Sequence, residues 1–526
     1  MLRDLSGRIM NSSTRTRGTV VSLARTLCVL LLVGPAIAVL LIPAEQWIGR
    51  LVIPDAVAYP IISWNLVHGF GPTYDGLAPT NGFHPLWLLI QLPLMVGADA
   101  PLDRMWAVKV LAVVVSVLAG LVWGRVARAC IRTASAPWLM AAGIGGSGWS
   151  LFVLYSGIEA PLVILMIGLC LLATCNLYPG PVSRSSAVGI GLMMGLTVLA
   201  RLDAVFFVAA LALVILPVLR RVGWDRVALA VLGGACLTVP YALYNLVQFG
   251  GIMPVSGLVK SRTTPSLSEG LDSLRQNLER IGNLVPPDVE PLVPAIFVAF
   301  LLLGGALLLR VLTWLPRDPS SRLLALVPIA AVAHSMWYLL FIREQLTPWH
   351  GYLQFLSILI VFASVPGLVF RGRREGIVSV ILVALMIGTT GGFAWMKSKR
   401  EGDRECSYIA AQWLQDTPLG TRAAMMDGWL VQLYAGPEYH ILDLTGLISD
   451  RENALLAKNR DYGELLDRNE IEYVLGFEEF VQTLGTGPVQ RRAKVPWNHD
   501  VRSFLLAEYN PTASREGGDP AAQSPR

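Results

Sequence analysis

Long apolar runs are the feature of this sequence that most restricts its fold. Stretches of about 20 mostly apolar residues recur along the chain, for example at 20–42, 107–126 and 291–309. As helices, stretches of this length match the hydrocarbon thickness of a bilayer. The composition agrees, because 54% of the 526 residues are hydrophobic and only 15% are charged, against about 25% charged residues in soluble proteins. We therefore expect a mainly α, polytopic membrane protein.

About eleven segments have the length and apolarity of membrane-spanning helices. They lie near 20–42, 105–126, 136–156, 160–178, 186–200, 203–219, 227–248, 291–309, 323–342, 350–370 and 376–395. The first run follows a basic N-terminal segment and therefore also resembles a signal peptide. It is long for the apolar part of a signal peptide, and further spans are predicted along the chain, so we interpret it as an uncleaved first span.

The distribution of arginine predicts the orientation of these spans, because cytoplasmic loops are enriched in Lys and Arg. If the N-terminal segment 1–19 is cytoplasmic, every loop on its side is basic, whereas the short opposite loops hold only Arg201 and Arg343. The basic loops and span ends contain Arg125, Arg128, Arg132, Arg184, Arg220, Arg221, Arg226, Arg310, Arg317, Arg322, Arg371, Arg373 and Arg374. The apolar stretch 85–97 has only about 13 residues, and as a span it would reverse this pattern. We predict a re-entrant or interfacial helix there.

This orientation divides the chain into a transmembrane module at 20–396 and a hydrophilic extracytoplasmic tail. The module carries a first outer loop at 43–104 and a second at 249–290. In the tail, 405–415 and 461–468 have helical patterns, and 422–427, 440–444 and 471–475 have strand patterns. We therefore predict a small α/β domain over 397–510, followed by a disordered end at 511–526 that is rich in Gly and Pro.

The six cysteines indicate neither disulfides nor a zinc site. Four lie in apolar runs, Cys130 lies in a basic loop, and Cys406 is the only one in the hydrophilic tail, which therefore cannot form a disulfide within itself. No CxxC or His/Cys cluster with zinc-ligand spacing occurs.

Polar residues concentrate on the side predicted to be extracytoplasmic. The first outer loop carries Asp55, Asn65, His68, Tyr74, Asp75, Asn81 and His84, and other outer turns carry Glu159, Arg201, Asp203, Lys260, Arg343 and His350. Ionisable groups at membrane depth are costly and suggest function. Solvation alone explains some of them equally well. Arg201 and Asp203 also fit a structural ion pair, Lys260 fits a solvated cation, and Trp349 and Tyr352 fit aromatic residues of the membrane interface.

The order of these motifs resembles that of bacterial membrane glycosyltransferases of the GT-C fold, in particular arabinofuranosyltransferase-like proteins. The resemblance rests on NLxxGxGxTxDG at 65–76, TNGFHPLW at 80–87, SGIEAPL at 156–162, ARLDA at 200–204, FGGIMPVSGLVK at 249–260 and the tail segment 413–447. It implies an enzyme that moves a hexosyl or pentosyl group from a polyprenyl-phosphate donor to a cell-envelope glycan or glycolipid, at the extracytoplasmic face of the membrane. Its partners would be the donor, the acceptor and the bilayer, with no nucleic acid.

The resemblance also implies a catalytic acid in the first outer loop, which falls on Asp55. Many relatives have two acidic residues in tandem, whereas here Pro54 precedes Asp55. This departure leaves the role of the first acid in doubt and leaves a divalent cation as an open question; we predict no other cofactor. Asp55 also fits the N-cap of a helix over 56–67.

Elementary chemistry is consistent with these residues. A phosphate leaving group needs no general acid, so one base for the acceptor hydroxyl and cations for the phosphate are sufficient for an inverting transfer. Arg201, Lys260 and Arg343 are the candidate phosphate ligands, and Asn81, His84, Glu159 and His350 are candidates for positioning the sugars. A transporter and a non-catalytic envelope assembly protein are the alternatives. The chain has no internal repeat of the kind that transporters often show.

Overall fold

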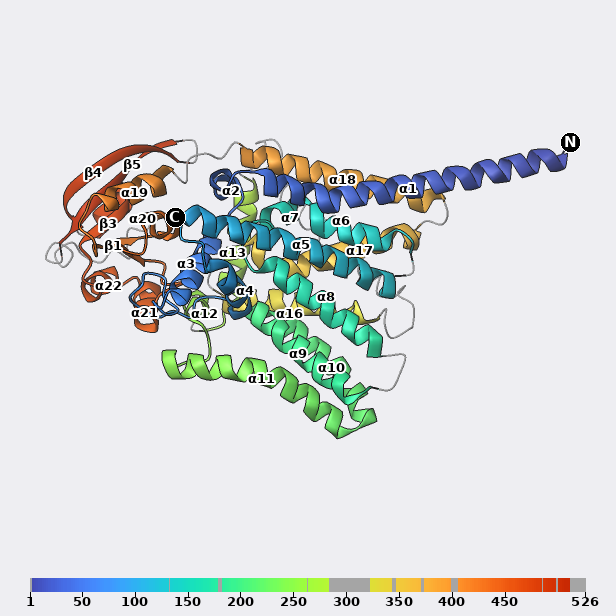
Figure 1. Cartoon of the computed structure of the whole chain (residues 1–526), viewed down its shortest axis with the longest axis horizontal. Coiled ribbons are helices and arrows are strands. Elements are labelled where there is room, and N and C mark those ends of the chain that lie inside the picture. Colours follow the sequence, from blue (N-terminus) through green and yellow to red (C-terminus); the bar gives the residue numbers. More distant parts are fainter. Residues whose placement is uncertain are drawn as a thin grey trace.

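A computed structural model describes residues 2–131, 133–177, 182–262, 264–282, 322–342, 347–369, 373–398, 405–484, 486–497 and 500–510. Long helices form a bundle, and a smaller region with a sheet covers one end of it (Figure 1). The N-terminal end of the first helix extends from the opposite end of the bundle.

The bundle helices largely coincide with the predicted spans. They are α1 (Leu2–Leu41), α5 (Pro101–Cys130), α6 (Ala136–Gly146), α7 (Gly148–Val153), α8 (Ala160–Leu177), α9 (Arg184–Ala200), α10 (Val205–Val222), α11 (Trp224–Phe249), α16 (Leu326–Phe341), α17 (Tyr352–Val369) and α18 (Arg373–Ser398). Among the described residues, five helices are long and apolar enough to cross a membrane, and further apolar helices are shorter. The chain is thus a membrane protein, while the number of spans stays a prediction and the span at 291–309 lies outside the described residues.

The span predicted at 136–156 is not one continuous helix. It breaks at Ser147, whose backbone is extended and whose hydroxyl accepts a hydrogen bond from the backbone N–H of Ser150. Ser147 therefore caps α7, and a serine that caps a new helix interrupts the preceding one. An apolar pattern alone does not reveal such a break.

Close helix packing depends on small residues. A methyl group on Gly191 of α9 would overlap the backbone carbonyl of Ala230 on α11, and one on Gly233 of α11 would press against the carbonyl of Val188 on α9. Such small residues let the backbones of membrane helices approach closely.

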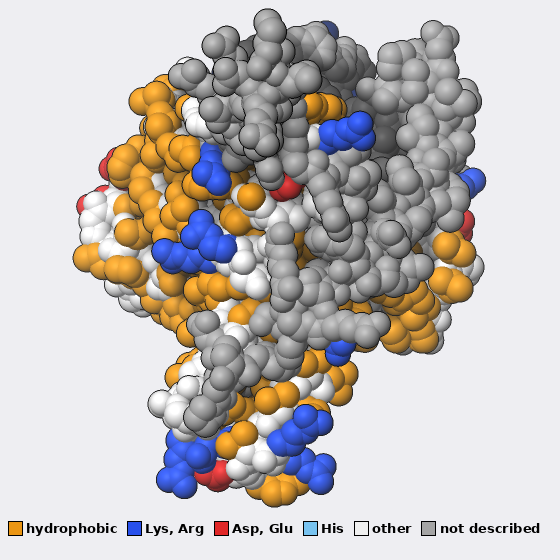
Figure 2. All heavy atoms as spheres, turned by 90° about the vertical axis from the view of Figure 1, so that its right-hand side faces the viewer, with side chains coloured by type: hydrophobic (Ala, Val, Ile, Leu, Met, Phe, Trp, Pro, Cys, Tyr) orange, Lys and Arg blue, Asp and Glu red, His pale blue; other side chains and the backbone are white. Residues whose placement is uncertain are grey.

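The helix ends alternate as the arginine pattern predicts. The C-terminal ends of α5, α8 and α10 lie at the end of the bundle that is remote from the sheet (Figure 1). On the described part of this end, Lys and Arg side chains lie among apolar side chains (Figure 2). Which end faces the cytoplasm remains a prediction.

The first outer loop folds into short helices at the sheet-covered end of the bundle: α2 (Ala44–Arg50), α3 (Asp55–Val67) and α4 (Pro85–Met95). The helix predicted at 85–97 is thus present, and its eleven residues extend only about 16 Å, too short for a span. The indoles of Trp47 and Trp87 donate to the backbone oxygens of Tyr155 and Gly157, at 2.8 and 3.0 Å. These hydrogen bonds fix the loop on the turn between α7 and α8. The second outer loop contributes α12 (Val255–Lys260) and α13 (Leu267–Gly282).

The C-terminal region, called the tail below, contains a five-stranded sheet in the order β2-β1-β3-β5-β4. Its strands are β1 (Arg422–Met425), β2 (His440–Asp443), β3 (Tyr473–Phe477), β4 (Thr486–Trp497) and β5 (Asp500–Tyr509), and its helices are α19 (Glu405–Gln415), α20 (Trp429–Ala435), α21 (Arg451–Asn459), α22 (Tyr462–Arg468) and α23 (Glu478–Thr483). Strands β1, β2 and β3 are parallel, and β4 and β5 extend the sheet as an antiparallel pair. The predicted helices and strands are all present, whereas the sequence analysis did not predict α20, α21, α23 or the hairpin.

Polar contacts attach the tail to both outer loops. The imidazole of His440 lies 2.7 Å from the backbone oxygen of Asp75. Arg451 donates to the backbone oxygen of Phe249 at 3.0 Å, and Lys458 donates to that of Leu258 at 2.8 Å. The tail therefore lies directly on the loops that carry four of the eight candidate site residues, Asp55, Asn81, His84 and Lys260.

Candidate functional site

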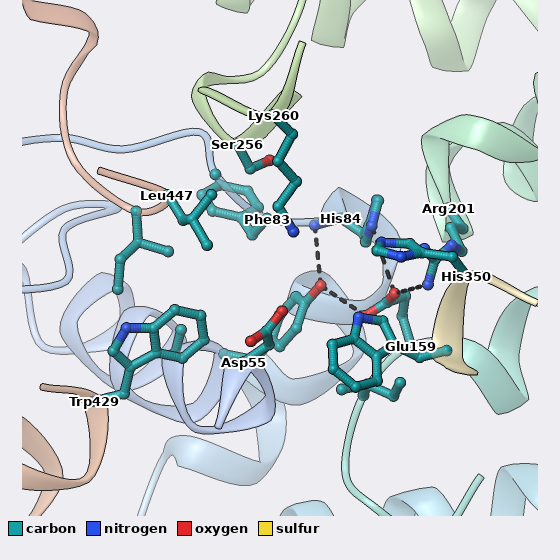
Figure 3. Close-up of a pocket in the computed structure, with 16 residues that line it drawn as sticks. Asp55, Phe83, His84, Glu159, Arg201, Ser256, Lys260, His350, Trp429 and Leu447 are labelled. Atoms are coloured by element: carbon teal, nitrogen blue, oxygen red, sulfur yellow. Dashed lines mark hydrogen bonds and ion pairs between the residues drawn. The ribbon is translucent and has the colours of Figure 1, made fainter. Parts of the chain in front are cut away.

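Most of the predicted site residues line one pocket beneath the tail, which we call the Asp55 pocket (Figure 3). Of the eight candidates, Asp55, His84, Glu159, Arg201, Lys260 and His350 line it. The tail contributes Trp429, Leu447 and Ile448 to the same walls. Residues far apart in the sequence, from both outer loops and the tail, thus meet around one small space of ≈ 70 Å³.

Asp55 is the first residue of α3, and Pro54 occupies the N-cap position. The alternative in which Asp55 is the N-cap is therefore wrong by one residue, although a carboxylate in the first turn still interacts favourably with the helix dipole. The side chains of Asp55 and Lys260 both point into the pocket, one from α3 and the other from α12 (Figure 3). A carboxylate and an ammonium group thus face the same space.

Arg201 lies at the centre of a buried ion-pair network. It is 2% exposed, and its guanidinium donates to Glu159 Oε1 at 2.5 Å and to Asp203 Oδ1 at 2.9 Å. The structural pair of Arg201 and Asp203 that the sequence allowed is therefore present, with Glu159 as a second acidic partner. Burial alone would raise the pKa of Glu159, but its electrostatic interactions with His84 and with the Arg201 guanidinium outweigh burial and lower that pKa. One guanidinium therefore faces two carboxylates.

The His84 ring beside Glu159 has a defined tautomer and protonation state. The backbone N–H of Leu202 donates to its Nδ1 at 3.3 Å, so Nδ1 is an acceptor, and Nε2 lies 3.5 Å from Glu159 Oε1. Burial lowers the pKa of His84, which favours a neutral ring with its proton on Nε2. Tyr59 donates to the other oxygen of Glu159 at 2.8 Å. Glu159 therefore orients His84 and Tyr59 at the edge of the pocket.

A second group of residues surrounds Asp203, and the sequence analysis did not identify most of it. The hydroxyl groups of Tyr338 and Tyr352 donate to Asp203 at 3.2 and 3.1 Å, and His334 Nε2 lies 3.2 Å from Oδ2. The interpretation of Tyr352 as an aromatic residue of the membrane interface is wrong, because its side chain is fully buried. A buried Tyr needs a polar partner for its hydroxyl, and Asp203 supplies it. No local motif around His334 or Tyr338 indicated this contact.

His350 lies in a short 3-10 helix, Pro348–His350, and is 5% exposed. Its Nδ1 lies 2.7 Å from the hydroxyl of Thr347. Burial, reinforced by the positive charges of Arg201 and Lys260, holds the pKa of His350 well below its usual value. The ring is therefore neutral at physiological pH and is available as a hydrogen-bonding group rather than a cation.

One candidate, Asn81, is not among the described residues that line the pocket. Asn81 donates to Asn245 Oδ1 at 3.1 Å and accepts from the backbone N–H of Val255 at 2.9 Å. It joins the two outer loops and supports the start of α12, the helix that ends at Lys260. Arg343 lies outside the described residues.

No obvious metal site is present in the part of the chain that the structure describes. There, no three His, Cys, Asp or Glu side chains come together in a way that could hold a metal ion. What the pocket offers instead is an acidic group and an ammonium group facing one space, backed by a buried polar network. This arrangement can accept a proton at one side and bind an anion at the other.

Solved structures identify the fold. ArnT from Cupriavidus metallidurans in the apo state matches with a TM-score of 0.58 at 13% sequence identity, over 92% of this chain and 98% of that chain. The GT-C fold predicted from the motifs is confirmed. The same ArnT bound to undecaprenyl phosphate matches with a TM-score of 0.53, at 13% identity and with the same coverage.

An archaeal relative of this fold also matches. The oligosaccharyltransferase AglB from Archaeoglobus fulgidus, in complex with an inhibitory peptide and a dolichol-phosphate, matches with a TM-score of 0.51 at 16% identity, over 88% of this chain and 69% of that chain. No family model and no curated protein matches the sequence. At such low identity these likenesses establish the fold and leave the activity to be argued from the pocket.

Proposed function

We propose that this chain is a membrane glycosyltransferase that moves a sugar from a polyprenyl-phosphate donor to an acceptor hydroxyl in the Asp55 pocket. The observation that carries the proposal is the position of Asp55 opposite Lys260 in that pocket. The fold adds support, because two proteins with the same fold were solved with undecaprenyl phosphate and with a dolichol-phosphate.

Each residue then has a chemical role in the transfer. Asp55 takes the proton of the acceptor hydroxyl, the acceptor oxygen forms a bond to the anomeric carbon, and the bond from that carbon to the phosphate oxygen breaks. The electron pair leaves with the polyprenyl phosphate, whose growing charge Lys260 stabilises. A single displacement of this kind inverts the anomeric configuration. Since a phosphate leaves as a weak base, no second carboxyl group is needed as an acid.

Arg201 has a more limited role in this scheme. Glu159 and Asp203 already engage its guanidinium, so we assign it to holding Glu159, and through Glu159 the His84 ring, rather than to binding phosphate alone. His84 and His350, neutral and buried, serve as hydrogen-bonding groups for sugar hydroxyls. Arg343 remains a candidate phosphate ligand. The sugar and its ring form, and with them the arabinofuranosyltransferase-like specificity, remain predictions of the sequence motifs.

The test is an assay of the full chain in lipid nanodiscs with a panel of polyprenyl-phosphate pentoses and hexoses. Release of the polyprenyl phosphate and the mass of the glycosylated product are both recorded. We expect one donor to be consumed by the wild-type protein and not by Asp55→Asn. The proposal is wrong if no donor is consumed by wild-type protein, or if consumption is equal in both proteins.

A further inference from the structure

A second and larger cavity lies on the other side of Trp349. Its volume is ≈ 570 Å³, within the range of cavities that bind organic ligands, whereas that of the Asp55 pocket is ≈ 70 Å³. Trp349 lines both spaces. The second cavity lies between the segment that joins α2 to α3 and the inner strands of the tail sheet, at Met425, Phe477 and Phe504.

The walls of the second cavity are mainly apolar and aromatic. Val52 and Ile53 line it from the first outer loop, and Leu430, Phe477, Phe480 and Phe504 line it from the tail. Such walls give few hydrogen bonds to the hydroxyl groups of a polysaccharide, whose desolvation would be costly. They fit an apolar chain, because burial of each methylene group is favourable by about 0.8 kcal/mol.

The position of the cavity indicates that it binds the acceptor and not the donor. Pro54 and Val57 line the cavity, and they flank Asp55 and Ala58, which line the Asp55 pocket. A molecule in the cavity therefore reaches the reaction from the side of the base, where an acceptor hydroxyl must lie. Lys260 reaches the pocket from α12, a different element (Figure 3).

We propose that the second cavity binds the apolar chain of a glycolipid acceptor, whose hydroxyl group reaches Asp55 past Trp349. This inference rests on the proposed function and narrows its acceptor from a glycan or a glycolipid to a glycolipid. Arg50 and Asp427, which line the same cavity, supply hydrogen-bonding groups for the first sugar of the acceptor. The polyprenyl chain of the donor lies elsewhere.

Photo-crosslinking tests the cavity without any need for activity. The probe is a decyl β-glucoside that carries a diazirine in its alkyl chain, added to the wild-type protein in nanodiscs. We expect labels on peptides around 48–57, 425–430 and 477–480, competed by decyl glucoside and not by methyl glucoside. Labels spread evenly over the membrane helices would overturn the proposal. So would competition by polyprenyl phosphate at least as strong as that by decyl glucoside, because the cavity would then belong to the donor.

A substitution that fills the cavity tests the same proposal, and it has a matched control. Leu430→Trp adds a ring beside the cavity, and Leu455→Trp adds the same ring at an exposed position of α21. We expect the first to reduce labelling at least tenfold and the second to leave it unchanged. In the transfer assay, decyl glucoside should have a KM at least about tenfold below that of methyl glucoside, and Leu430→Trp should abolish this difference.

Hydrolysis of the donor distinguishes a failure of the acceptor cavity from a failure of the proposed function. If the cavity binds the acceptor, Leu430→Trp leaves the KM of the donor for hydrolysis unchanged, and an increased donor KM would contradict the proposal. If the wild-type protein consumes no donor at all, the proposed function fails, and the labelling pattern still decides whether the cavity takes an apolar chain.

Discussion

Gly82 lies directly against the backbone of Leu447, so closely that a methyl group on Gly82 would overlap the carbonyl oxygen of Leu447. Gly82 belongs to the first outer loop and Leu447 to the tail, and both line the Asp55 pocket. A glycine is therefore required where the tail backbone crosses the loop. This contact fixes the tail on the pocket.

Gly82→Ala should displace the tail. Because the added methyl group meets backbone atoms rather than a flexible side chain, Leu447 must move and the pocket must open. We expect faster hydrogen exchange at 445–450 and at least a tenfold loss of transfer. Gly189→Ala is the matched control, since no atom lies within 4 Å of its added methyl group. Equal exchange and activity in both variants would show that the contact does not hold the tail.

Asp55→Asn should reduce transfer by roughly 100-fold to 10,000-fold, the range typical of a lost general base. Asparagine keeps the size and polarity of the side chain but cannot accept a proton. Turnover of purified protein in nanodiscs measures the loss, and the melting temperature should stay within a few degrees of that of the wild-type protein.

Asp75→Asn is the control for that substitution. Asp75 accepts hydrogen bonds from the backbone N–H groups of Leu77 and Ala78 through one oxygen, and the carbonyl oxygen of an asparagine can do the same. Its turnover should remain within about threefold of wild type. A severe loss at Asp75 with a mild loss at Asp55 would reverse the assignment of the base.

Arg201→Met should destabilise the protein strongly. The substitution leaves Glu159 and Asp203 as buried carboxylates without their cation, and breaking a buried pair in this way typically costs about 3–5 kcal/mol. Arg184→Met removes an ion pair of the same kind with Asp225, but at the surface, where little change is expected. Thermal unfolding of both variants in the same nanodiscs compares them. Similar melting temperatures would refute the structural role of the buried network.

The tail should become less stable as the pH rises from about 4 to 7. Burial, together with the nearby charge of Asp427, raises the pKa of Asp443 from 3.8 to about 7, although Thr445 and Trp429 partly oppose the shift. Between these values the folded state binds more protons than the unfolded state, so the free energy of unfolding falls with rising pH. At pH 8, Asp443→Asn should therefore stabilise the sheet by on the order of 1–4 kcal/mol.

Hydrogen exchange of β1, β2 and β3, compared between variant and wild type at each pH, measures this effect. The difference should vanish near pH 4, where the carboxyl group is protonated in both states. Asp272→Asn, at an exposed position of α13, should have no effect at either pH. A stabilisation by Asp443→Asn that is the same at pH 4 and pH 8 would contradict the argument.

Tag fusions should report the orientation of the chain. Tags after 132, 223, 318 and 373 should be cytoplasmic, and tags at 75, 270 and 450 should be outside, because the predicted cytoplasmic loops are the arginine-rich ones. Accessibility to a membrane-impermeant reagent in intact cells is the measurement. An external tag after 132 would mean that the chain between 85 and 97 crosses the membrane.

Much of this fold could be predicted from patterns that are local in the sequence. Apolar runs located the bundle helices, and the short run that became α4 was recognised because a span there would have reversed the arginine pattern. The break at Ser147 was missed because a capping serine looks like any other small residue in an apolar run. The hairpin of β4 and β5 was missed because its strands are partly exposed and contain charged residues such as Arg491 and Arg502.

The pocket itself was only partly predictable, for a similar reason. Residues in recognisable motifs, such as Asp55, His84 and Glu159, were identified and do come together. Trp429, His334 and Tyr338 were not identified, because their roles depend on contacts with residues more than a hundred positions away. Asn81 was identified from its motif, yet its amide joins the two outer loops, a role that its sequence neighbours do not reveal.

The contribution of the tail to the pocket also has a consequence for biosynthesis. The walls of the pocket extend in sequence from Asp55 to Ile448, so the helices inserted first cannot form the complete site. The pocket closes only when the C-terminal region has been translated and has folded onto the loops. A truncated or stalled chain therefore lacks part of the pocket wall, and any chemistry in the pocket has to await the C-terminal region.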